Sequence, residues 1–229
     1  MQIRKLNENT WMLDDGFVRG YLLAGTKEAV LIDTCASSGE AKALAQTVTK
    51  LPLVLINTHG DGDHIAGNDA FDEFYMGEAD YANCNVAARC PGSRLIPLKD
   101  TDVIDPGDRP LEIIAIPGHT FGSAAILDRK ARVLYSGDSV QDGHIYMFGA
   151  HRQPEAFAAS LDRLIAMEEQ FDCIRPAHGT EELPAGFVRT VAKAWQQVLA
   201  GNVTGKPEEL HGRAVVTYDA DGCGFYCNE

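Results

Sequence analysis

Short apolar runs separated by polar turns dominate the start of the chain. Three of them, residues 11–13, 17–23 and 29–32, are divided by Asp14-Asp15-Gly16 and by the segment 24–28. Runs of this length bounded by glycine and aspartate are typical of strands joined by tight turns. The N-terminal part of the chain is therefore predicted to form an antiparallel meander.

The middle of the chain changes between extended and helical patterns. Strands are expected at residues 53–57, 74–76, 94–98, 102–105, 111–116, 123–127 and 133–135, helices at 40–50 and 78–89, and a short helical turn at 66–71. Residues 140–152 follow neither a helical nor a strand period and combine aromatic residues with glycine. We expect this segment to be a substrate loop or lid.

The C-terminal part begins with a helix that Pro154 opens and that extends to about residue 170, with Phe157, Leu161 and Leu164 at helical spacing. A short strand at 171–174, a helix at 186–200 and strand character at 214–218 and 224–226 follow. The sequence leaves open whether the last residues cover a site or only complete a sheet. No repeat, low-complexity segment or linker interrupts residues 1–229, so one domain is expected.

The composition narrows the classes of partner. The chain of 229 residues has a formal net charge of −13, which argues against nucleic acid and anionic membranes because a polyanion would be repelled. Its apolar runs fall far short of the roughly 20 residues that span a bilayer, and the N-terminus lacks an apolar signal region. We expect a cytoplasmic protein with a small-molecule substrate. The oligomeric state stays open, with a homodimer among the alternatives.

Candidate chemistry is concentrated in Thr58-His59-Gly60-Asp61-Gly62-Asp63-His64, shortly after the apolar run 53–56. Imidazole nitrogens and carboxylate oxygens are ligands for zinc, iron or manganese. Gly60 and Gly62 are expected to let the backbone turn sharply, so that several side chains converge. The segment therefore predicts a metal site at the end of a strand.

Ligand-type residues recur where other predicted strands end. Asp33, His119, Asp138 and His178 each follow an apolar run, in most cases beside a glycine. One such histidine or aspartate alone is usually an ordinary polar residue or a turn former. Because the pattern repeats, we interpret these residues as parts of one centre.

In motif order, roughly residues 10–180 resemble the metallo-β-lactamase superfamily. The resemblance rests on Leu31-Ile32-Asp33-Thr34, on the segment from Thr58 to Gly67, on Pro117-Gly118-His119-Thr120, on Ser136-Gly137-Asp138-Ser139 and on Pro176-Ala177-His178-Gly179. It implies an α/β fold, a four-layer αβ/βα sandwich with the site at one edge of paired sheets. The superfamily includes β-lactamases, glyoxalase II-type thioesterases, lactonases, ribonucleases and flavodiiron proteins, so the substrate stays undetermined.

The resemblance also implies roles. His59, Asp61 and His119 would bind a first divalent metal ion, and Asp63, His64 and His178 a second. Asp138 would bridge the two ions. Asp33 would accept a hydrogen bond from a ligand imidazole and set its tautomer.

This chain departs from the family pattern His-x-His-x-Asp-His at Asp61, which stands where the second histidine is usual. A carboxylate there adds negative charge and shifts the preference from zinc toward iron or manganese, although zinc remains the first expectation. Asp61 could complete a dinuclear site, be too short and weaken the first site, or leave the chain with one metal ion. We expect the dinuclear site.

The function expected from this pattern is a metal-dependent hydrolase, in which a hydroxide bridging the two metal ions attacks a small ester, thioester, lactone or phosphoester. Asp63 would orient the nucleophile and help to move its proton. Tyr146, His144, His151 and Arg152 are candidates for contacts with the substrate.

Two other functions remain. Asp61 also suits a diiron redox protein related to flavodiiron proteins, although no flavin motif follows, and an inactive metal-binding module would keep the fold without turnover. A nuclease is disfavoured by the net charge and a secreted β-lactamase by the missing signal region. Among the six cysteines, Cys223 and Cys227 form the one close pair near an end, and a metal site or disulfide there is a minor alternative.

Overall fold

Two sheets packed face to face form the centre of the molecule. The structure is a computed structural model that describes residues 1–37, 39–83 and 86–229. The first sheet follows the chain order, with strands β1 (Gln2–Asn7), β2 (Thr10–Asp14), β3 (Arg19–Ala24), β4 (Ala29–Ile32), β5 (Leu53–Ile56), β6 (Glu73–Gly77) and β7 (Arg94–Leu98). The predicted meander is therefore present. It has one further strand on its outer side, β1, which was not predicted because its residues form no apolar run.

The second sheet has the order β14-β13-β11-β10-β9-β8. Its strands are β8 (Val103–Ile104), β9 (Leu111–Ala115), β10 (Ala124–Asp128), β11 (Val133–Gly137), β13 (Cys173–Pro176) and β14 (Leu183–Pro184). Buried residues of both sheets form one cluster, in which Leu23 and Ile32 of the first sheet pack with Ile113 and Ile126 of the second. The sheets thus share a core.

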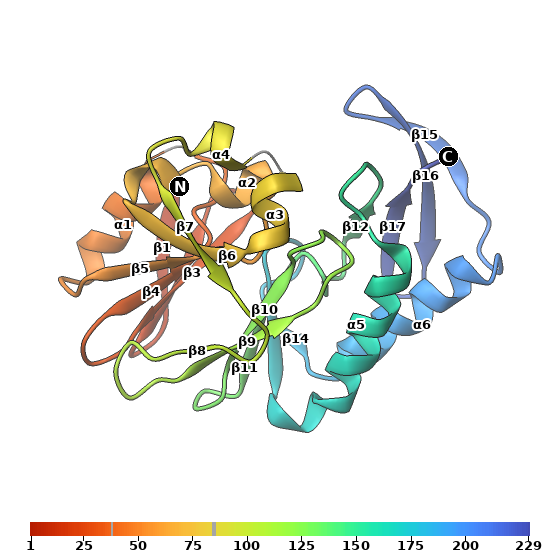
Figure 1. The fold of residues 1–229 in the computed structure, drawn as a ribbon. Coiled ribbons are helices and arrows are strands. Elements are labelled where there is room, and N and C mark those ends of the chain that lie inside the picture. Colours follow the sequence, from red (N-terminus) through yellow and green to blue (C-terminus); the bar gives the residue numbers. More distant parts are fainter. Residues whose placement is uncertain (38, 84–85) are drawn as a thin grey trace.

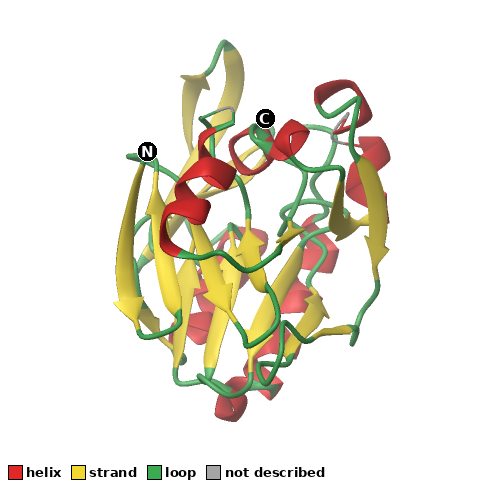
Figure 2. Cartoon of the chain, turned by 90° about the vertical axis from the view of Figure 1, so that its left-hand side faces the viewer, coloured by secondary structure: helices red, strands yellow, loops and turns green. Residues whose placement is uncertain are grey.

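Helices cover the outer faces of both sheets. Those on the first sheet are α1 (Glu40–Val48), α2 (Gly62–Ile65), α3 (Glu78–Asn83) and α4 (Val86–Arg89), with a 3-10 turn η1 (Asn68–Ala70); those on the second are α5 (Pro154–Ala166) and α6 (Phe187–Leu199), with η2 (Glu168–Gln170). Figure 1 shows the two groups on opposite sides, and Figure 2 shows α1 lying across the first sheet. The four-layer αβ/βα sandwich is confirmed.

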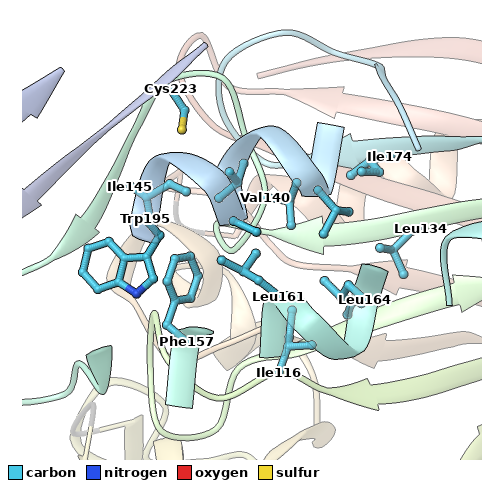
Figure 3. Packing of buried hydrophobic residues seen from close by; sticks show 14 of the residues in the cluster. Ile116, Leu134, Val140, Ile145, Phe157, Leu161, Leu164, Ile174, Trp195 and Cys223 are labelled. Carbon is cyan, nitrogen blue, oxygen red and sulfur yellow. The ribbon is translucent and has the colours of Figure 1, made fainter. Parts of the chain in front are cut away.

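The helical spacing in α5 explains its position. Phe157, Leu161 and Leu164 lie on one face and are buried against the second sheet and against Trp195 of α6 (Figure 3). The predicted helix ends earlier than expected, at Ala166, and continues as η2. Residues 84 and 85 of the helix predicted over 78–89 lie outside the described residues.

A smaller sheet has the order β12-β17-β16-β15 and lies beside α5 and α6 (Figure 1). Its strands are β12 (His144–Met147), β15 (Lys206–Leu210), β16 (Arg213–Ala220) and β17 (Cys223–Cys227). The prediction that residues 140–152 form a loop was wrong for β12, which pairs in parallel with β17. Only Ile145 and Met147 face the core, and two apolar positions are too few to reveal a strand period.

Two parallel strand pairs bring their carboxyl ends to one edge of the molecule. Ile32 of β4 is paired with Ile56 of β5, and Gly137 of β11 with Pro176 of β13. The residues that follow these four strands therefore leave the sheets together. No helix of the described residues is both long and apolar enough to cross a membrane.

Candidate metal centre

The residues that follow these strand ends, together with His119 after β9, converge on one site. The structure brings together all seven residues that were predicted as metal ligands: His59, Asp61, Asp63, His64, His119, Asp138 and His178. Their ligand atoms form overlapping groups within which all distances are at most 4.8 Å. These residues come from four separate segments of the chain, so only the tertiary fold brings them together.

The first group contains His59, Asp61 and His119. The two Nε2 atoms lie 3.2 Å apart. Oδ2 of Asp61 lies 3.6 Å from Nε2 of His59 and 3.3 Å from Nε2 of His119. The shorter aspartate side chain therefore reaches the position at which a second imidazole would be expected.

The second group contains Asp63, His64 and His178. Oδ2 of Asp63 lies 3.3 Å from Nε2 of His178 and 3.8 Å from Nε2 of His64. Asp138 lies between the groups, because its Oδ1 is 3.2 Å from Nε2 of His64 and its Oδ2 is 3.5 Å from Nε2 of His119. This carboxylate faces both groups at once.

The four imidazoles all turn the same nitrogen toward the centre. Each Nδ1 has an oxygen partner outside the cluster: Thr58 Oγ1 for His59 at 3.0 Å, Asp33 Oδ2 for His64 at 2.9 Å, the Tyr146 carbonyl for His119 at 3.0 Å and the Phe17 carbonyl for His178 at 2.7 Å. A carbonyl or carboxylate can only accept, so Nδ1 donates, and in the neutral imidazole Nε2 is then the nitrogen whose lone pair is available to a metal ion. The Thr58 hydroxyl donates to Asp33, which leaves its oxygen free to accept from His59.

These residues fit divalent metal ions. Nε2 of His64 and Oδ1 of Asp138 are buried without a hydrogen-bond partner among the described residues, which is costly unless a ligand satisfies them. A tetrahedral zinc site with bonds of the usual length has ligand atoms about 3.3–3.4 Å apart, and most distances within the cluster are close to this value. Imidazole and carboxylate are donors that zinc, iron and manganese accept.

The carboxylates stabilise positive charge at the centre of the cluster. Burial opposes ionisation of Asp138, but the charges of His64 and His178 hold its pKa well below the ordinary value. Burial likewise opposes a charge on His178, yet Asp138 and Asp63 raise its pKa to about 10. His119 differs, because burial and then the charge of Arg152 lower its pKa to about 4. A bound cation would be stabilised by the same carboxylates.

Asp33 supports the cluster as the resemblance implied. Its side chain is buried, and its two oxygens accept hydrogen bonds from the Thr58 amide at 2.8 Å, the Thr58 hydroxyl at 2.7 Å and Nδ1 of His64. Asp33 therefore fixes His64 directly and His59 through Thr58.

Asp80 is a support that the sequence did not reveal. Its buried carboxylate accepts hydrogen bonds from the Gly60 amide at 2.9 Å, the Gly122 amide at 2.6 Å and the Thr120 hydroxyl at 2.6 Å. It thus joins the loop that carries His59 to the loop that carries His119. Its position in a predicted helix gave no signal, because acidic residues near a helix start are common.

The glycines of the motif act differently from the expectation. The predicted sharp turn at Gly62 was wrong, because α2 begins there with ordinary helical geometry. A side chain at Gly62 would place its Cβ 2.4 Å from Nη1 of Arg89. Gly62 therefore leaves room for the guanidinium group of Arg89 at the wall of the site.

The cluster opens into a pocket of about 730 Å³. Among the predicted substrate residues, Tyr146 and His144 line it, but His144 stacks on Tyr226 and its Nε2 lies 3.0 Å from Asp219. His151 lines an adjoining pocket instead. Arg152 does not extend freely toward a substrate, because its Nη2 lies 2.7 Å from Oδ2 of Asp61.

Several residues of the pocket wall were missed. Phe17, His211, Arg213 and Tyr226 line it together with Arg89. Three of them belong to the smaller sheet and its β15–β16 turn, so the end of the chain both completes a sheet and covers the site. These residues follow no motif, and only the pairing of β12 with β17 brings their sheet to the site.

Cys223 and Cys227 do not form the alternative site. Both are free cysteines, and they stand at the two ends of β17. Positions four apart in a strand are separated by about 13 Å, which is too far for a disulfide.

Comparison with known proteins agrees with the geometry. The sequence model of the metallo-beta-lactamase superfamily matches residues 13–76 and 89–184. The acyl-coenzyme A thioesterase MBLAC2 of Bos taurus is 26% identical over 199 residues, which cover 69% of this chain and 71% of that protein. The hydroxyacylglutathione hydrolase of Gloeobacter violaceus is 31% identical over 126 residues, 54% of this chain and 50% of that protein.

A solved structure supports the fold. The metallo-beta-lactamase from Pontibacter korlensis superposes with a TM-score of 0.70 at 18% identity, covering 85% of this chain and 98% of that one. At this level of identity the likeness concerns the arrangement of the elements alone.

Proposed function

Since this chain belongs to the metallo-beta-lactamase superfamily, we propose that it is a metal-dependent hydrolase whose substrate is a small thioester. Two relatives carry names of thioester hydrolases, which favours thioesters over the esters, lactones and phosphoesters that the sequence left open. The observation that carries the proposal is the cluster of inward-facing imidazoles and carboxylates at the base of a 730 Å³ pocket.

The proposed cofactors are two divalent metal ions, with zinc first and iron or manganese as alternatives. His59, Asp61 and His119 would hold one ion, Asp63, His64 and His178 the other, and Asp138 both. Oδ2 of Asp61 lies 3.3 Å from Nε2 of His119, which supports a role for Asp61 as a metal ligand even though its side chain is shorter than that of histidine. Bound ions of this kind lower the pKa of water and polarise a carbonyl oxygen.

The chain's own residues would prepare the reaction in three ways. Asp33 and the Tyr146 and Phe17 carbonyls hold the imidazoles in one tautomer. Asp63 is partly exposed to the pocket. Burial raises the pKa of its carboxyl group, but the hydrogen bond to His178 and the charge of His64 outweigh this effect and lower the pKa below its ordinary value. Ionised Asp63 can therefore accept a hydrogen bond from the attacking water and orient it.

The pocket wall supports a small, partly apolar substrate. Phe17, Tyr146, Phe148 and Tyr226 line it and offer apolar surface to an acyl chain. A nucleic acid is not proposed as substrate, because the net charge of −13 would repel it.

The first experiment is elemental analysis of the purified protein, followed by assays with thioesters, lactones and phosphoesters. About two zinc or manganese ions per chain with thioester cleavage is the expected result. His119→Ala should lower the metal content and abolish cleavage. Val191→Ala, which shortens a buried side chain of α6, controls for a general loss of stability.

A diiron redox protein is the second candidate, because Asp61 brings a carboxylate into the first group. Two iron ions per chain, a visible absorption band and no cleavage of any ester would favour it. Normal metal content and normal cleavage in His119→Ala would contradict the whole site assignment.

A further inference from the structure

Three arginines line a second pocket that opens beside the metal centre. This pocket has a volume of about 310 Å³, and Arg89, Arg152, Arg213 and His151 contribute to its wall. Asp61, Arg89, Phe148 and Arg213 line both this pocket and the larger one, so the two are continuous. A substrate in the larger pocket could extend into it.

Arg152 shows that this pocket is prepared for a ligand. Its side chain is only 9% exposed, and its Nη2 atom contacts Asp61. Its Nε and Nη1 atoms are buried and have no hydrogen-bond partner among the described residues. A buried guanidinium with unmet donors is costly, and an anion in the pocket would satisfy them.

Arg89 and Arg213 reach the same pocket from other elements. Nη1 of Arg89 lies over Gly62, and Nη1 of Arg213 would be 3.5 Å from a Cβ at Gly149. Within residues 1–37, 39–83 and 86–229, neither guanidinium forms an ion pair with a carboxylate. Both are therefore free to bind an anion.

The charges do not balance within the pocket. Three guanidinium groups face one carboxylate, Asp61, so two positive charges remain in a chain that has 20 basic and 33 acidic residues. A phosphate group at neutral pH carries close to two negative charges and accepts paired hydrogen bonds from guanidinium groups. A phosphate therefore matches the excess better than a single carboxylate does.

We propose that Arg89, Arg152 and Arg213 form a subsite for a phosphate group on the thiol-bearing half of the thioester. The inference rests on the proposed thioester hydrolysis and makes it specific, because it favours a phosphorylated thiol such as coenzyme A over glutathione. Arg213 determines specificity, whereas Arg152 both binds the phosphate and positions Asp61.

Steady-state kinetics with the metal-loaded protein test this inference. The KM for an acyl-coenzyme A should be at least about tenfold lower than that for the same acyl group on pantetheine, which lacks the phosphates. Arg213→Gln should raise the KM for the coenzyme A ester about tenfold, with a much smaller effect on kcat. Its effect on the KM for the pantetheine ester should be much smaller, because that ester has no phosphate group for Arg213 to bind.

Arg94→Gln is the matched control, because Arg94 is an exposed arginine of β7 that pairs with Glu73 and lines neither pocket. It removes the same charge and should change neither KM. Equal KM values for the two esters in the unsubstituted protein would overturn the subsite. So would an equal change for both esters in Arg213→Gln.

Direct binding separates failure of the subsite from failure of the proposed function. Calorimetry with S-methyl-coenzyme A, S-methyl-pantetheine and S-methyl-glutathione uses thioethers that are not cleaved. Binding of the first alone, weakened about tenfold in Arg213→Gln, would support the subsite even if no thioester were hydrolysed. Equal binding of the three, or none, would contradict it even if thioesters were hydrolysed.

Discussion

Oδ2 of Asp33 lies 2.9 Å from Nδ1 of His64, and Oδ1 lies 2.8 Å from the amide nitrogen of Thr58. Asp33 has a φ angle of 60°, a left-handed conformation that aspartate tolerates better than most residues. This backbone angle at the end of β4 turns the carboxylate toward the end of β5. One residue therefore joins two neighbouring strand ends at the metal centre.

Replacing Asp33 by asparagine should weaken metal binding by about 10–100-fold, the usual range for a group that supports a ligand. If the asparagine oxygen accepted the hydrogen bonds from Thr58, the asparagine NH2 group would face Nδ1 of His64. His64 could accept a hydrogen bond from that group only by losing the proton on Nδ1. Chelator competition measures the affinity. Asp172→Asn, at a side chain that is 70% exposed, is the control. Equal affinities in both variants would show that Asp33 does not support a ligand.

Replacing Asp61 by histidine should shift the metal preference toward zinc, because an imidazole replaces a carboxylate. The same change removes the partner of Arg152, so the free energy of unfolding should fall by about 3–5 kcal/mol, as for other broken buried pairs. Asp61→His combined with Arg152→Gln should recover much of this loss. Elemental analysis and urea unfolding provide the two measurements. An unchanged metal preference would mean that Asp61 is not a ligand.

Replacing Gly118 by alanine should distort the loop that carries His119. Gly118 has a φ angle of 149°, and a Cβ there would lie 2.4 Å from Cα of Phe157 in α5. Gly16 is a suitable comparison, because its φ angle is 88° but a Cβ would meet no atom within 4 Å. Gly118→Ala should therefore lose about 1–3 kcal/mol more stability than Gly16→Ala. It should also lose metal affinity. Equal stabilities of Gly118→Ala and Gly16→Ala would show that α5 can shift to accommodate the added methyl group.

The sequence predicted the layers of the fold because they depend on local patterns. The spacing of Phe157, Leu161 and Leu164 marks the buried face of α5, and the apolar runs of β4 and β5 mark central strands. The pairing of β12 with β17 was not predictable in this way. It joins Ile145 to Phe225 across most of the C-terminal part of the chain, and such long-range pairing leaves little local signal.

The residues of the candidate site likewise differ in whether local sequence patterns could predict them. Residues at strand ends could be found, because His59, Asp138 and His178 each follow an apolar run within a few residues. Asp80 and Arg213 could not. Asp80 acts through backbone amides of two loops, and Arg213 is the first residue of β16, just outside the strand predicted at 214–218, in a sheet whose pairing with β12 was not predicted. Groups that recognise the substrate or support a loop depend on tertiary contacts alone.

Thiol reactivity should follow the pKa shifts of the free cysteines. Burial and then the charge of Asp33 raise the pKa of Cys35 to about 12, and burial raises that of Cys227 to about 11. A higher pKa leaves less of the reactive thiolate, so at pH 8 Cys35 should be alkylated more slowly than Cys227, and both far more slowly than in the unfolded chain. Each rate should increase with pH up to the pKa. Peptide mapping after iodoacetamide treatment measures the order, with Cys84, which lies outside the described residues, replaced by serine. Cys35 reacting as fast as Cys227 would contradict its burial beneath the strand end that carries Asp33.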